Sequence, residues 1–136
     1  MALSPEQYAS ELRFKLSLQG RVDVEQVASS LGIRVYEDEL DGCDGVLLRL
    51  DGKALIITSR KCTYSTRKRF TIAHESGHFC IPSHDSCEFR CTEAESSSYR
   101  AISLFEREGN KFAGELLLPL SEIEKVLKGP PSMRLI

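Results

Sequence analysis

The sequence predicts a small α+β domain in which helices pack on a β-sheet of about three strands. Three observations support this fold class. Two capped amphipathic segments open the chain, short β-prone runs joined by an Asp-Gly turn follow, and apolar residues at helical spacing return in residues 66–80 and 105–117. With 136 residues and 41% hydrophobic content, we expect residues 1–136 to form a single domain around one core.

The first two helices are predicted from their N-terminal caps. Ser4 precedes Pro5 and Gln7, the pattern of a capping box with proline at the first helical position, and helical spacing continues to residue 18. Asp23, with a glutamine three residues later, repeats the cap before a second and shorter helix, which a glycine ends.

Short β-prone runs follow these helices. The predicted strands cover residues 33–36, 46–50 and 53–58. The last two flank Asp51 and Gly52, and an Asp-Gly pair between such runs indicates a tight hairpin. We expect residues 82–98 to form a surface loop near the functional site and residues 121–127 to form one more short helix.

The most informative segment reads HESGH at residues 74–78, inside a predicted helix over residues 66–80. Two histidines four residues apart lie one turn apart on the same helix face, so both imidazoles can reach one metal ion. Glu75 lies about 100° around the helix from His74, beside such an ion, where its carboxylate can take a proton from water. Apolar residues on both sides place this helix at the centre of the fold. The pattern predicts a metallopeptidase with Glu75 as its general base.

A third metal ligand is expected from the helix predicted over residues 105–117. A helical wheel places Glu106 on the apolar face and Glu108 on the opposite face. A carboxylate within an apolar stripe is unfavourable unless a cation neutralises it, which favours Glu106 as the ligand, with an ion pair to an arginine as the alternative. Asn110, one turn later, is placed to orient a ligand, and Gly109 lets this helix approach the metal helix closely.

His84 is an alternative third ligand, since it stands six residues after His78, the offset of the third histidine in the zinc motif HExxHxxGxxH. Here Ile81, a β-branched residue that resists positive φ, replaces the glycine of that motif, and Pro82 follows it. We therefore expect His84 to be a loop residue or a transition-state donor. The sequence leaves three candidate donors unranked: Tyr64, Tyr99 and His84.

The cysteines and the overall charge restrict location and partners. Four residues could hold a second, structural zinc, with reduced thiols as the alternative: Cys80, His84, Cys87 and Cys91. Five cysteines is an odd count that favours a reducing compartment, and with no signal-like or membrane-spanning run we expect a cytoplasmic protein with no membrane contact. The formal net charge is −2 and the one dense basic cluster lies at residues 67–69, so we expect no direct binding to nucleic acid.

Two segments resemble the ImmA/IrrE family of metallopeptidases. Residues 69–78 read RFTIAHESGH and residues 106–119 read EREGNKFAGELLLP, where family members typically show RFTIAHELGH and ExxANxFAAELLMP. The resemblance extends from about residue 12 to about residue 127 and implies a zincin-like domain, with Glu75 matching the general base. The positions that match the metal ligands are His74, His78 and Glu106. Zinc suits two imidazoles and one carboxylate, although this set would also accept manganese or another divalent ion.

The resemblance also implies a biological role. Family members are cytoplasmic proteases that cleave helix-turn-helix repressors and thereby release stress, phage-like or mobile-element genes, which would make such a repressor the partner and transcription regulation the outcome. Members often continue further, so a C-terminal extension is expected to be missing here. The alternative is a non-catalytic metal-binding module that binds a repressor or senses zinc or redox state through the cysteine cluster.

Two positions depart from the family pattern. Ser76 stands where leucine is usual, and we expect a packing deficit of roughly a few kcal/mol, with the hydroxyl bonded to the carbonyl one turn back. Gly109 stands where alanine is usual, which weakens its helix by roughly 1 kcal/mol.

Overall fold

In chain order, two helices precede a run of three strands and further helices follow it, as predicted for an α+β domain. The computed structural model describes residues 3–61, 65–86, 88–91 and 103–119, together with the single residues 123 and 127. Its elements, in chain order, are α1 (Pro5–Lys15), α2 (Val24–Ser30), β1 (Ile33–Asp38), β2 (Gly45–Leu50), β3 (Lys53–Ser59), α3 (Ser65–Cys80), β4 (Glu88–Cys91) and α5 (Leu104–Leu117). The short helix expected over residues 121–127 falls mostly outside the described residues.

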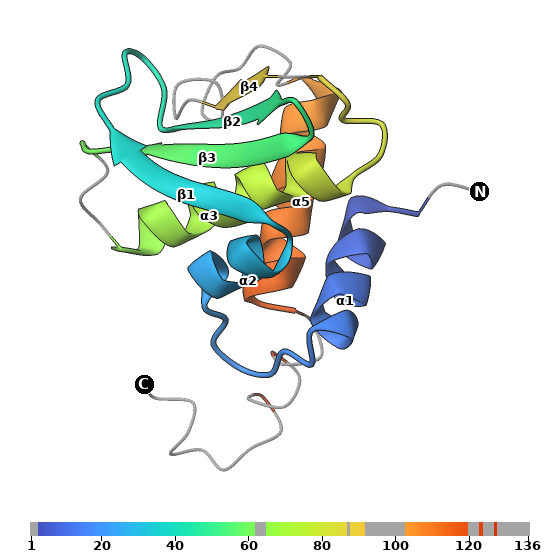
Figure 1. Cartoon of the computed structure of the whole chain (residues 1–136). Coiled ribbons are helices and arrows are strands. Elements are labelled where there is room, and N and C mark those ends of the chain that lie inside the picture. Colours follow the sequence, from blue (N-terminus) through green and yellow to red (C-terminus); the bar gives the residue numbers. More distant parts are fainter. Residues whose placement is uncertain are drawn as a thin grey trace.

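The described strands form one mixed sheet in the order β1-β3-β2-β4 (Figure 1). β1 runs parallel to β3, and β2 runs antiparallel to both β3 and β4. The prediction of about three strands missed β4, which lies within the segment expected to be a loop. β4 has four residues, and of its two described side chains, Glu88 and Phe89, only Phe89 is buried, so the strand is too short to show a period-2 pattern in the sequence. Pairing with β2, which places Phe89 beside Leu47, creates this strand.

The hairpin between β2 and β3 confirms the reading of the Asp-Gly pair. Asp51 has φ 50° and Gly52 has φ 75°, so both residues lie in the left-handed region that a two-residue type I′ turn requires. The turn fixes the register in which Leu50 faces Lys53 and Leu47 faces Ile56.

Both predicted N-terminal caps are present. The Ser4 hydroxyl accepts the backbone N–H of Gln7, whose side chain accepts the N–H of Ser4 at 2.8 Å, and the Asp23 carboxylate accepts two N–H groups at the start of α2. The predicted end of the first helix at residue 18 is wrong, because α1 ends at Lys15. Ser17 takes a left-handed φ of 54°, and the N–H of Leu18 bonds back to a carbonyl of the last turn, which closes the helix as glycine usually does.

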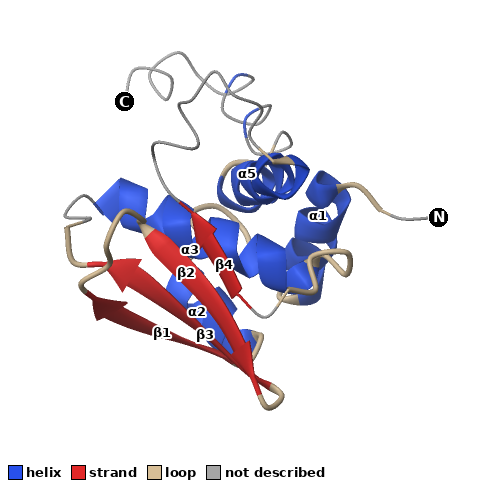
Figure 2. Ribbon diagram, turned by 90° about the horizontal axis from the view of Figure 1, so that it is seen from above, coloured by secondary structure: helices blue, strands red, loops and turns tan. Residues whose placement is uncertain are grey.

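α3 lies between the sheet and the other long helices, and this position confirms that it is central. Figure 2 shows α3 against one face of the sheet, with α5 and α1 on the side of α3 that faces away from the strands. All eight residues from 71 to 78 are buried. Because a helix covered on both sides has little contact with water, polar groups in this stretch need partners inside the protein. In the described part of the chain, no helix combines the length and apolar character needed to cross a bilayer.

Candidate metal centre

Two imidazoles from α3 and one carboxylate from α5 meet in a single cluster. The Nε2 atoms of His74 and His78 are 3.0 Å apart, Glu106 Oε2 lies 3.2 Å from His74 Nε2, and Glu106 Oε1 lies 3.0 Å from His78 Nε2. Each residue offers one ligand atom, and these atoms all lie within 4.8 Å of one another. Atoms that are each about 2.0–2.1 Å from a tetrahedral ion lie roughly 3.3 Å from one another, so this spacing suits a shared metal.

The hydrogen bonds around the cluster also suit a cation. His74 Nδ1 lies 2.8 Å from Asn110 Oδ1, and because an amide oxygen only accepts, Nδ1 carries the proton. A neutral His74 then has a lone pair on Nε2, which faces the carboxylate of Glu106. Two electron-rich atoms in contact need a proton or a metal ion between them, so the residues present fit a divalent metal. Asn110 lies where the helical wheel predicted, one turn after Glu106.

The pKa values of the two histidines are shifted in opposite directions. Burial acts most strongly on His74 and lowers its pKa, but the hydrogen bond to Glu106, the charges of Glu75 and Glu106 and the bond to Asn110 outweigh it, so the net shift is upward. Burial lowers the pKa of His78 to about 4, against the opposing effect of Glu106. In the metal-free protein, His74 is therefore the ring that takes a proton between itself and Glu106. A metal ion would replace that proton.

Close packing of α3 on α5 brings the ligands together. A Cβ atom on Gly77 would lie 2.9 Å from the Cγ and Cδ1 atoms of Phe112, which is completely buried. A Cβ on Gly109 would lie 2.8 Å from His74 Cε1. Real Cβ atoms do not approach carbon so closely, so the two glycines permit a helix crossing that alanine would widen. The predicted role of Gly109 in close approach is therefore confirmed.

Glu75 is fully buried on the side of α3 that faces the sheet. A Cβ on Gly45, the first residue of β2, would lie 3.2 Å from Glu75 Oε2 and 2.4 Å from a methyl carbon of Thr71. The absence of a side chain on Gly45 thus makes room for this carboxylate. The charge of Glu75 raises the pKa of His74, which places it within electrostatic reach of the cluster.

The Ser76 hydroxyl donates to the carbonyl of Ile72 at 2.8 Å, as predicted. Since Ser76 is 1% exposed, this bond satisfies a polar group at a position where the family pattern has leucine.

The structure places His84 in the loop after α3, where it was expected, and corrects the placement of Glu108. His84 is completely buried, with Nδ1 2.8 Å from His78 Nδ1 and Nε2 2.9 Å from Glu108 Oε1. Glu108 was expected on the far side of its helix, away from the site. The segment after α3 covers that side of α5, so Glu108 contacts a site residue there. His78 and Glu108 thus occupy both ring nitrogens of His84. Neither nitrogen is left to serve as the third metal ligand, which was the alternative role for His84.

The other candidate residues are only partly visible. Cys80 has a free thiol whose pKa burial raises to about 12, with Arg49 and Lys15 opposing the shift, and so high a pKa disfavours the thiolate that a zinc ligand must be. The remaining candidates lie outside the residues or side chains that are described: Tyr64, Tyr99, Cys87 and the side chain of Cys91.

Arg49 is a supporting residue that the sequence did not reveal. From β2, its guanidinium donates to the carbonyls of His78 and Phe79 at the end of α3, and to those of His84 and Ser86 in the following segment. Carbonyls at a helix C-terminus lack intrahelical donors and carry partial negative charge, so the half-buried guanidinium of Arg49 suits them. No signal short of the tertiary structure identifies this arginine, because its partners are 29 to 37 residues away.

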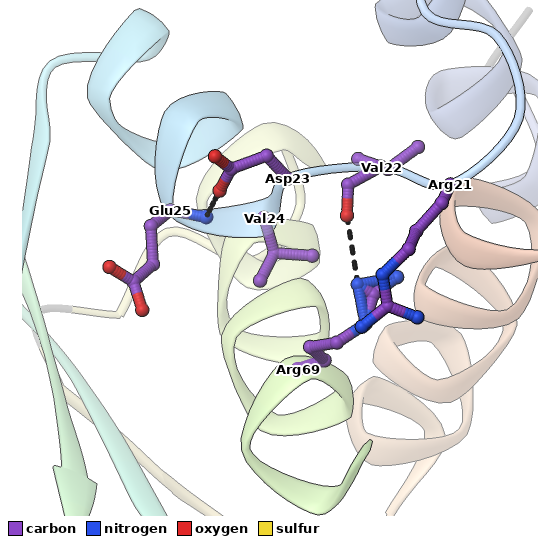
Figure 3. Close-up of a pocket in the computed structure, with 6 residues that line it drawn as sticks. All are labelled: Arg21, Val22, Asp23, Val24, Glu25 and Arg69. Atoms are coloured by element: carbon purple, nitrogen blue, oxygen red, sulfur yellow. Dashed lines mark hydrogen bonds between the residues drawn. The ribbon is translucent and has the colours of Figure 1, made fainter. Parts of the chain in front are cut away.

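The basic cluster at residues 67–69 is occupied by contacts within the chain. Arg67 pairs with Asp44, Lys68 Nζ lies 3.6 Å from Glu37, and Arg69 donates to the carbonyl of Val22 at 2.8 Å. Arg69 also lines a pocket of about 330 Å³ with residues 21–25 (Figure 3). Figure 3 shows two hydrogen bonds there, from the backbone N–H of Glu25 to the Asp23 carboxylate and from Arg69 to the carbonyl of Val22. None of the three clustered ligand residues lines this pocket.

Comparison with known proteins agrees with this geometry. No curated protein matches the chain significantly. The model of the Peptidase_M78 family, described as the IrrE N-terminal-like domain, matches residues 28–133 and so covers α3, α5 and the whole described sheet. The resemblance noted from the two sequence segments is therefore confirmed, and the chain belongs to the IrrE N-terminal-like family of metallopeptidases.

Proposed function

We propose that this chain is a zinc-dependent metalloendopeptidase that cleaves a helix-turn-helix transcriptional repressor in a stress, phage-like or mobile-element response. The observation that supports it most strongly is the convergence of His74, His78 and Glu106 on one point, with the buried Glu75 within electrostatic reach of His74. Two imidazoles and one carboxylate are a common ligand set of catalytic zinc in peptidases, which leaves a coordination position for water.

In this proposal, His74 and His78 hold the ion through Nε2 and Glu106 holds it through its carboxylate. When bound, zinc supplies Lewis acidity to a water molecule and to the carbonyl of the peptide bond. Glu75 accepts a proton from the attacking water on its carboxylate and then delivers it to the amine that leaves. Asn110 keeps the Nδ1 proton of His74, so that Nε2 remains the ligand atom.

The finer parts of the proposal have separate support. A peptidase implies a protein substrate, and a repressor as that substrate follows from the sequence resemblance. We place the reaction in the cytoplasm because five cysteines is an odd count, which suits reduced thiols in a reducing compartment. Zinc is preferred to other divalent ions because the spacing of the ligand atoms suits a tetrahedral ion.

Glu75→Gln tests the general base. The zinc-loaded variant and the parent are each incubated with repressors encoded beside the gene, new termini are identified by mass spectrometry, and metal content is measured in parallel. We expect equal zinc content and a loss of cleavage of about 10²- to 10⁴-fold. Glu115→Gln, which makes the same chemical change on α5, serves as a control and should cleave normally.

Two outcomes would contradict the proposal. Cleavage by Glu75→Gln at the parental rate would remove Glu75 from the mechanism. A stoichiometric complex between the zinc-loaded parent and a repressor, without new termini, would favour the alternative of a non-catalytic binding module.

A further inference from the structure

Four side chains from three segments form a continuous row of contacts that ends at the candidate metal centre. Glu108 Oε1 is 2.9 Å from His84 Nε2, His84 Nδ1 is 2.8 Å from His78 Nδ1, and His78 Nε2 is 3.0 Å from Glu106 Oε1. His78 and His84 are completely buried, whereas Glu108 retains 24% exposure of its side chain. The row therefore connects a carboxylate at the protein surface to a metal ligand in the interior.

The number of protons in this row decides which atom faces the metal. Two neutral imidazoles carry two N–H protons, whereas the row contains three contacts, so one contact has no proton. A carboxylate only accepts, so His84 carries a proton on Nε2 and donates it in a hydrogen bond to Glu108. His84 Nδ1 then has a lone pair and accepts from His78 Nδ1. This arrangement leaves the lone pair of His78 on Nε2, directed at the contact with Glu106 where a cation would lie.

Neighbouring groups hold the two rings in the orientation that this row needs. The ring of Phe89 stacks on His78 with centroids 4.2 Å apart and planes 8° from parallel, and Phe105 lies against His84 at 4.4 Å. Arg49 bonds to the backbone carbonyls of both histidines, which fixes the segment that carries His84 relative to α3. With ring planes and backbone fixed, the hydrogen bonds decide the tautomer of His78.

We propose that Glu108 and His84 are positioning residues that set the tautomer of His78, so that its Nε2 atom is available to the metal. The proposal rests on the metal site of the proposed function. It extends that function by assigning each metal-binding histidine a separate hydrogen-bond partner. The amide of Asn110 orients His74, and a two-residue relay, His84 followed by the Glu108 carboxylate, orients His78. Partners of this kind orient a metal-bound imidazole and increase its basicity.

The first test reads the tautomer directly in the metal-free protein. Long-range ¹H–¹⁵N correlation spectra of histidine-labelled protein distinguish a proton on Nδ1 from one on Nε2. We expect His78 to carry its proton on Nδ1 in the parent and to shift toward the Nε2 form in Glu108→Ala. A parent with the proton of His78 on Nε2, or a Glu108→Ala spectrum identical to the parent's, would overturn the proposal.

The second test measures zinc affinity by competition with a chelator. We expect Glu108→Ala to bind zinc about 10-fold more weakly, within the 10- to 100-fold range found when such partners are lost. Glu108→Gln keeps an oxygen that can accept from His84, so it should recover most of the affinity although it lacks the charge. Glu115→Ala removes a charge from the same helix at a residue outside the described row and metal cluster, so it should bind zinc normally.

The variants separate the relay from other effects. Equal weakening in Glu108→Gln and Glu108→Ala would show that charge alone matters and would overturn the relay. Equal weakening in Glu115→Ala would do the same. Neither readout requires peptide cleavage, so a chain that binds zinc through this relay but cleaves no repressor would contradict the proposed function and leave the relay supported.

Discussion

Replacing Gly77 by alanine tests the close crossing of α3 and α5. The new Cβ would lie 2.9 Å from Cγ and Cδ1 of Phe112, whereas carbon atoms in good contact are about 3.5–4.0 Å apart. Phe112 is completely buried and has no room to retreat, so the helices must separate by several tenths of an ångström. Overpacking of this kind costs about 1–3 kcal/mol, while alanine in a helix gains about 1 kcal/mol over glycine. We expect a net loss of up to about 2 kcal/mol.

Gly114→Ala is the matched control. Gly114 lies in the interior of α5, and a Cβ there would meet no atom within 4 Å. Gly114→Ala therefore gains helix propensity without a clash, and the folded variant should be more stable than the parent by about 0.5–1 kcal/mol. Thermal denaturation with a chelator present, which removes stabilisation by bound metal, should show a fall in Tm of up to about 7 °C for Gly77→Ala and a rise of about 2–3 °C for the control.

The comparison can refute the reasoning. If Gly77→Ala is as stable as Gly114→Ala, then α3 and α5 have space at this crossing, and the argument that glycine brings Glu106 to the histidines fails. A weaker zinc affinity in Gly77→Ala, with no change in the control, is the second expected result, because separation of the helices moves Glu106 away from both imidazoles.

Two further predictions concern the site and its surroundings. Gly109→Ala should keep the Tm within about 3 °C of the parent's, because helix propensity improves. It should weaken zinc binding about 10-fold in a chelator competition, because the new Cβ would lie 2.8 Å from His74 Cε1. Unchanged zinc affinity would show that the His74 ring moves freely. Cys80, with a pKa raised from 9.0 to about 12, should be alkylated about 1000-fold more slowly in the folded protein than in the unfolded protein at pH 8, and the rate should rise about tenfold per pH unit. The neutral thiol is favoured by the fold, so its contribution to stability is complete below pH 9 and is lost as the pH rises toward 12. Mass spectrometry of the peptide that contains Cys80 measures the rate, and equal rates in folded and unfolded protein would contradict the shift.

Much of the site could be predicted because it depends on local helix geometry. His74 and His78 lie four residues apart, and Glu106 and Asn110 repeat that spacing on the second helix, so a wheel is sufficient to place each pair on one face. The position of Glu108 could not be found in this way. A wheel assumes that the side opposite the apolar stripe faces water, but here the segment that carries His84 covers it.

The sequence by itself determined the caps of α1 and α2, the Asp-Gly hairpin and the two helices that carry His74, His78 and Glu106. Each of these features results from interactions among residues no more than about four positions apart, which the order of amino acids specifies directly. Only the tertiary structure decided that β4 exists, that Arg49 holds the end of α3 and that His84 joins Glu108 to His78. Those contacts link residues that are distant along the chain, 24 positions for His84 and Glu108 and 35 for Arg49 and His84, and they form only when the packing of the core brings their segments together.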